Sequence, residues 1–142
     1  MLTIVMGPSC AGKSTYIKEH FPNTEVVDIL DFQANLIVAT EETVLKTYEE
    51  HLNKVKELLS QGKDVVIEHT LLKAKRRLWY IQQIREVYSG DIDIICIKPS
   101  EDLLAFRSQL RHIAQWYTLL MLDELELPTF EEGYKNITII EE

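Results

Sequence analysis

The stretch LTIVMGPSCAGKST, Leu2–Thr15, decides the fold because it joins a short apolar run to a glycine-containing loop. The run Leu2–Met6 is rich in β-branched residues and predicts a buried strand. The segment Gly7–Ser14 matches the pattern G-x-x-x-x-G-K-[ST] at each fixed position, and Ser14–His20 is expected to form a helix after it. A strand, such a loop and a helix in this order predict backbone N–H groups that point inward and bind phosphate.

The loop residues have separate expected roles in binding a nucleoside triphosphate. Lys13 would bring positive charge to the β- and γ-phosphates, and the Ser14 hydroxyl would be a ligand of Mg²⁺. Binding of this kind does not by itself distinguish a kinase from a hydrolytic switch. The predicted nucleotide-binding residues of the loop are Gly7, Ser9, Cys10, Ala11, Gly12, Lys13, Ser14 and Thr15.

The rest of the chain alternates short apolar runs with longer helical patterns, which predicts an α/β fold. Strands are expected at Glu25–Leu30, Asp64–Glu68, Ile92–Ile97 and Asn136–Ile140, and helices at Glu41–Gln61, Lys73–Tyr88 and Glu101 to about Leu122, the last in one piece or two. The helix at 73–88 is expected to bury Leu78, Trp79, Ile81, Ile84 and Val87. We therefore expect a three-layer α/β/α P-loop NTPase fold with a mainly parallel five-stranded sheet.

Length and composition restrict the possible partners. The 142 residues fit one domain, 1–142, with a short lid at about 105–118. A net charge of −8 argues against binding long duplex nucleic acid, and no apolar run is long enough to span a membrane. Two cysteines, Cys10 and Cys96, are too few for a disulfide scaffold, so a reducing cytoplasm is the expected location.

Carboxylates follow two of the predicted strands, at the sheet edge where ligands bind in such folds. Glu68 would help Ser14 hold the hydrated metal, or would instead cap the next turn. Asp28 and Asp31 lie at or just past the end of the second strand, and either could be the base that takes a proton from an acceptor hydroxyl. Which of the two faces the phosphates depends on where the strand ends.

Several basic and aromatic residues in the second half of the chain can each be interpreted in two ways. Arg107 and Arg111 are four residues apart and would form a cationic clamp, or an exposed pair. The cluster Lys73, Lys75, Arg76 and Arg77 would bind an anionic acceptor, or would form the solvated start of a helix. Trp116 and Tyr117 would stack on a base or pack in the core, with the core expected. All four histidines are interpreted as structural.

Four stretches together resemble a small P-loop kinase of the polynucleotide-kinase-like group. This group neighbours the zeta-toxin-like and gluconate-kinase-like enzymes in the AAA-type ATP-binding family. The stretches are GPSCAGKST at 7–15, VVIEHTLLKAKRRLW at 65–79, RSQLR at 107–111 and LELPTFEEGYKNITII at 125–140.

The resemblance implies ATP-dependent transfer of the γ-phosphoryl group to a hydroxyl, that of a nucleic-acid 5′ end or of a small molecule. It implies ATP and Mg²⁺ as cofactors and an aspartate after the second strand as the base. Lys13 and the lid residue Arg111 would stabilise the transferred group, and Arg107 would contact the nucleotide. The acceptor would lie near Thr70, Arg76 and Arg77.

One departure from the family pattern keeps a second hypothesis open. The family usually has an arginine three residues after the catalytic aspartate, where it helps to hold the acceptor. In this chain Asp31 follows Asp28 at that spacing, and Ala34 follows Asp31. The alternative is therefore a nucleotide-binding ATPase or regulatory module without an acceptor of its own.

Overall fold

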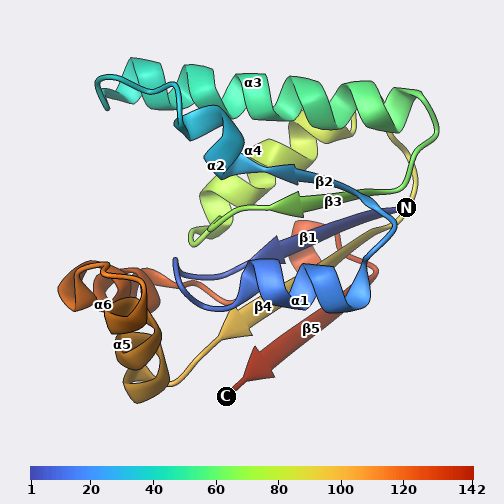
Figure 1. Ribbon diagram of the computed structural model, residues 1–142. Helices are drawn as coiled ribbons and strands as arrows, with labels where there is room; N and C mark the ends of the chain where they lie inside the picture. The colour runs from blue at the N-terminus through green and yellow to red at the C-terminus, as the bar shows by residue number, and fades with distance from the viewer.

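The apolar run at the start of the chain forms the central strand of the sheet. The computed structural model describes residues 1–142, and its strands stand in the order β2-β3-β1-β4-β5, each paired in parallel with its neighbours (Figure 1). Every β1 residue is buried because the strand has neighbours on both sides and helices on both faces. The strands are β1 (Leu2–Met6), β2 (Glu25–Asp28), β3 (Val65–Glu68), β4 (Ile92–Lys98) and β5 (Asn136–Glu141).

Six α-helices and one short 3-10 helix connect and cover these strands. They are α1 (Lys13–His20), α2 (Ile29–Gln33), α3 (Glu41–Ser60), α4 (Ala74–Ile84), α5 (Glu101–Leu110), α6 (Gln115–Glu124) and η1 (Phe130–Glu132). Local sequence explains where the longest helix begins: Thr40 and Thr43 cap α3 reciprocally. None of the helices is both long and apolar enough to span a membrane.

The two faces of the sheet are covered unequally. Alternate residues of β1 (Leu2, Ile4 and Met6) belong to an 18-residue core that also contains side chains of α3 and α4. Val5 belongs to a six-residue core on the other face, together with Ile17 of α1. The predicted three-layer arrangement with a parallel five-stranded sheet is therefore confirmed (Figure 1).

Several predicted boundaries were wrong. β2 ends at Asp28 rather than Leu30, because the Asp28 side chain accepts a hydrogen bond from the backbone N–H of Leu30 and caps α2. The helix predicted at 73–88 ends at Ile84. Leu78 and Val87 were predicted to be buried but are exposed. The α4 residues that are buried recur at helical spacing, and they are Arg77, Tyr80, Ile81 and Ile84.

Arg77 does not reach a substrate, contrary to the sequence prediction, because it forms a buried ion pair with Glu132. Its Nε and Nη2 donate to the two carboxylate oxygens over 2.7 and 3.1 Å. Its Nη1 donates to the carbonyl of Leu71 over 2.8 Å, and the Tyr134 hydroxyl donates to Glu132 over 2.8 Å. The pair therefore joins α4 to the segment that leads into β5.

We predict that Arg77→Met destabilises the protein by about 3–5 kcal/mol, because it leaves the Glu132 carboxylate buried without its partner. The double variant Arg77→Met/Glu132→Leu is expected to recover much of this loss, since it removes both charges. Urea unfolding followed by circular dichroism measures both changes. Asp91→Asn, which breaks the exposed pair with Lys135, is the control and is expected to cost less than about 1 kcal/mol. An Arg77→Met protein as stable as the wild type would contradict a structural role for this arginine.

Candidate active site

The phosphate loop curls between β1 and α1 because two glycines adopt backbone angles that other residues rarely accept. Gly7 has φ +151°, and a Cβ atom there would lie 2.5 Å from the carbonyl oxygen of Ile97. Gly12 has φ +102° and forms the N-cap of α1. The Gly7 N–H also donates to the carbonyl of Thr70 over 3.2 Å. The loop is thus held close to β4 and to the residues that follow β3, and it opens at the positive end of α1.

Lys13 folds back over the loop that contains it. Its Nζ donates to the carbonyls of Gly7 and Pro8 over 2.8 and 2.9 Å. Burial lowers the pKa of this ammonium group to about 8, although the nearby carboxylates of Glu68 and Asp28 partly oppose the shift. The arrangement places a positive charge inside the curl of the loop.

Ser14 and Glu68 form a pair of oxygen ligands suited to a hydrated metal ion. The Ser14 hydroxyl donates to Glu68 Oε2 over 2.6 Å, so the predicted association of these residues is present. Burial raises the pKa of Glu68, and the hydrogen bond from Ser14 opposes that effect. No group of three or more His, Cys, Asp or Glu side chains gathers to enclose a metal. A hydroxyl and a carboxylate beside a phosphate loop fit Mg²⁺, which usually keeps waters and takes phosphate oxygens as further ligands.

The structure separates the two candidate bases. Asp28 ends β2, lies opposite Glu68 in the register of β2 with β3, and lines the cavity above the phosphate loop. Burial raises the pKa of its carboxyl group, and the charge of Asp31 contributes to the shift. Asp31 is exposed on α2 and does not line that cavity. The geometry therefore favours Asp28 as the carboxylate that faces the phosphates.

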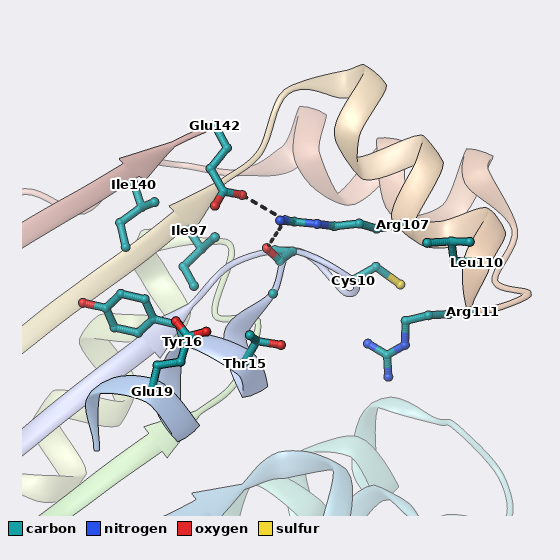
Figure 2. Close-up of a pocket in the computed structure, with 12 residues that line it drawn as sticks. Cys10, Thr15, Tyr16, Glu19, Ile97, Arg107, Leu110, Arg111, Ile140 and Glu142 are labelled. Carbon is teal, nitrogen blue, oxygen red and sulfur yellow. Dashed lines mark hydrogen bonds and ion pairs between the residues drawn. The ribbon is translucent and has the colours of Figure 1, made fainter. Parts of the chain in front are cut away.

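Arg107 and Arg111 project from the end of α5 toward the loop (Figure 2). Arg107 Nη1 donates to the carbonyl of Ala11 over 2.7 Å and pairs with Glu142 over 2.9 Å. Arg111 lines the cavities on both sides of the loop, and its charge contributes to the lowered pKa of Lys13. The segment predicted to form a lid, at about 105–118, contains the second half of α5, a turn at 111–114 and the start of α6.

Two cavities flank the loop. The first, of about 310 Å³, is also lined by residues of α1, β4, β5 and α5 and is the one drawn in Figure 2. Several of its residues were not predicted from sequence: Tyr16, Glu19, Ile97, Leu110, Ile140 and Glu142. The second, of about 440 Å³, contains the polar groups described above and further residues that sequence reasoning missed: Ile29, Leu30, Gln33, Tyr48, Ile113 and Met121. These residues come from three helices (α2, α3 and α6) and from the turn after α5, so no local spacing indicated that they would meet.

Of the remaining predicted site residues, some line a cavity and others do not. Thr70 lines the second cavity, whereas Arg76 lies over the rings of Tyr48 and Trp79 and lines neither cavity. The expectation that Trp116 and Tyr117 pack in the core was wrong, because they are 71% and 44% exposed. They lie on α6, which packs chiefly against α5.

Comparisons with known proteins agree with this fold. A sugar kinase from Janibacter sp. HTCC2649 aligns with a TM-score of 0.72 and 16% identity over 99% of this chain and 84% of that chain. A gluconokinase from Sinorhizobium meliloti 1021 aligns with a TM-score of 0.62 and 21% identity over 98% and 81%. A chain of the Pnkp1/Rnl/Hen1 RNA repair complex aligns with a TM-score of 0.68 and 18% identity over 87% and 43%.

A search of curated proteins finds no significant match. At the sequence level, a family described as an AAA domain matches residues 2–116, which include the phosphate loop, Asp28, Glu68, Arg107 and Arg111. Because this match covers well over half of the 142 residues, the chain belongs to this AAA domain family.

Proposed function

We propose that the protein is an ATP-dependent kinase that transfers the γ-phosphoryl group to a hydroxyl acceptor. The observation that carries this proposal is the position of Asp28. It places a partly buried carboxylate in the same cavity as Lys13 and Glu68, where an acceptor hydroxyl would meet the γ-phosphate. The kinases with the same fold support the proposal, and the acceptors named for them differ from one to another.

The nucleotide would lie along the phosphate loop. Its β- and γ-phosphates would accept hydrogen bonds from loop N–H groups, and Lys13 would exchange the carbonyls of Gly7 and Pro8 for phosphate oxygens. The first cavity, between Tyr16, Ile97 and Ile140, offers an apolar place for the base beside Arg107. Ser14 and Glu68 would hold Mg²⁺, which when bound neutralises charge on the phosphates.

Transfer requires that one bond forms as another breaks. The acceptor oxygen bonds to the γ-phosphorus while the bond from that phosphorus to the β–γ bridging oxygen breaks, and ADP leaves. Asp28 takes the proton of the acceptor hydroxyl, and its raised pKa makes it a stronger base than an ordinary aspartate. Arg111, which borders both cavities, would stabilise the negative charge on the phosphoryl group during transfer.

We predict that Asp28→Asn lowers phosphoryl transfer about 10²- to 10⁴-fold while ATP binding is retained, because the base is lost and the phosphate loop is unchanged. Asp31→Asn is the matched control, since it removes the same charge three residues further along the chain, on α2 and outside the cavity. It is expected to keep transfer within a few-fold. It should also move the acidic limb of the pH–rate profile to lower pH, because Asp31 contributes to the raised pKa of Asp28.

The measurement is transfer of label from [γ-³²P]ATP to each member of a panel of hydroxyl acceptors. The panel includes nucleosides, sugars and 5′-hydroxyl oligonucleotides. Label that appears only as free phosphate across the whole panel would contradict a kinase and would favour the ATPase alternative. Loss of transfer in Asp31→Asn but not in Asp28→Asn would instead reverse the assignment of the base.

We predict that ATP affinity falls as the pH rises above about 8, by up to about tenfold per pH unit. Burial lowers the pKa of Lys13 to about 8 in the free protein, and bound phosphates would raise it again. Binding therefore requires uptake of a proton once the free lysine is neutral. The charge of ATP itself is constant in this range, because a phosphate's second ionisation lies near about pH 6.

Equilibrium binding from pH 7 to 10 in the presence of EDTA measures this dependence without a metal ion. Cys10→Ala provides the background, so that the phosphate loop contains no cysteine. Lys13→Arg in that background should remove the slope, since arginine remains charged throughout. An affinity that is constant between pH 8 and 10 in the Cys10→Ala protein would contradict the assigned role of Lys13.

A further inference from the structure

The second cavity has two opposed walls above the phosphate loop. One wall comes from α2 and from Tyr48 of α3, and the other from the turn after α5 and from α6. In Figure 1, α2 and α3 lie on one side of the loop between β1 and α1, and α6 lies on the other. The space between them, next to Asp28, is where the proposed acceptor would bind, and it belongs to a cavity of about 440 Å³. A volume of this order suits a small molecule.

The cavity has few positive charges to offer an anionic acceptor. Lys13 and Arg111 are the only lysine or arginine side chains that line it, and both are committed to the nucleotide phosphates in the proposed function. Asp28 and Glu68 line it as carboxylates. Arg77, the basic residue predicted to hold an anion, is instead buried in its ion pair with Glu132.

The charged side chains near the cavity that do not line it are also unfavourable for anions. Asp31 is exposed on α2, and its charge raises the pKa of both Asp28 and Glu68, so its negative field reaches the cavity. Arg76 is stacked on Tyr48 and Trp79, at 5.2 and 5.1 Å from the ring centroids, and does not line the cavity. An acceptor with a carboxylate or phosphate group would be repelled here rather than held.

The walls present aromatic and apolar surface instead. Tyr48 reaches the cavity from α3 and Tyr117 reaches it from α6. The Tyr48 ring is held in place by Arg76 and by His69, whose ring centroid is 5.0 Å away. The other apolar wall residues are Ile29, Leu30, Ile113 and Met121. Gln33 and Thr70 add neutral hydrogen-bonding groups.

We propose that the acceptor is an uncharged small molecule that combines a hydroxyl group with a flat, weakly polar ring system, as nucleosides and aromatic alcohols do. This inference rests on the proposed phosphoryl transfer and specifies its substrate class. The ring lies between Tyr48 and Tyr117, and its hydroxyl faces Asp28. Flat rings stack on tyrosine with little dependence on their exact identity.

The test compares kcat/KM for five kinds of acceptor with Mg²⁺ and [γ-³²P]ATP. Nucleosides and neutral aromatic alcohols are the two classes of acceptor that contain a flat ring. The class with the higher kcat/KM identifies which kind of flat ring the cavity accepts. Glucose is neutral without a flat ring, gluconate is anionic, and a 5′-hydroxyl oligonucleotide is polyanionic. We expect the kcat/KM of a neutral acceptor with a flat ring to exceed that of each of the other three by about tenfold or more.

Failure of this inference differs from failure of the proposed function. If glucose, gluconate or the oligonucleotide is the best acceptor, the assigned substrate class is wrong and phosphoryl transfer still stands. If label appears only as free phosphate, phosphoryl transfer to an acceptor is overturned, and the substrate class with it.

Variants test the walls separately from the phosphate loop. Tyr117→Ala should raise the KM for the preferred acceptor about tenfold and leave the KM for ATP unchanged. Trp116→Ala is the matched control, since the neighbouring ring on α6 is 71% exposed and does not line the cavity. Asp31→Arg should improve the use of gluconate several-fold relative to the neutral acceptor. Unchanged acceptor KM in Tyr117→Ala, or an unchanged acceptor ratio in Asp31→Arg, would overturn the proposed recognition.

Discussion

The close approach of the Gly7 backbone to the carbonyl of Ile97 is the constraint on which the site depends. A side chain at Gly7 would collide with that carbonyl at 2.5 Å, so the chain can turn there only as glycine. The turn ends at Gly12, and Lys13 and Ser14 are therefore the first two residues of α1. This position directs the Lys13 ammonium group into the loop and the Ser14 hydroxyl toward Glu68. The phosphate-binding groups are thus arranged by backbone geometry before any ligand is present.

Parallel strands bring the remaining acidic groups to the same edge. β3 lies between β2 and β1, so the ends of these strands place Asp28 opposite Glu68, beside the phosphate loop. The sequence predicted this gathering because each carboxylate follows a recognisable apolar run. It did not distinguish Asp28 from Asp31, because the distinction depends on a single cap: Asp28 accepts a hydrogen bond from Leu30 N–H, and α2 begins there. Asp31 is consequently turned away from the cavity on an exposed helix position.

Long-range pairing explains what the sequence could not predict. Arg76 and Arg77 are adjacent and chemically equivalent in sequence, yet Arg76 lies over two aromatic rings and Arg77 is buried against Glu132, 55 residues away. The two arginines differ because Arg77 lies on the buried face of α4 and Arg76 does not. Similarly, Tyr48 and Tyr117 meet at one cavity only because α3 and α6 stand on opposite sides of the loop. The basic cluster at 73–77, which was expected to bind an anion, therefore contributes no side chain to the second cavity.

The central claim is that the phosphate loop, Lys13 and Asp28 form one site for the transferred phosphoryl group. A crystal structure with Mg²⁺ and a non-hydrolysable ATP analogue tests this claim most directly. The account predicts that Lys13 Nζ leaves the carbonyls of Gly7 and Pro8 for phosphate oxygens, and that the γ-phosphate faces Asp28 across the second cavity. A triphosphate bound away from the loop, or a γ-phosphate turned away from Asp28, would contradict it.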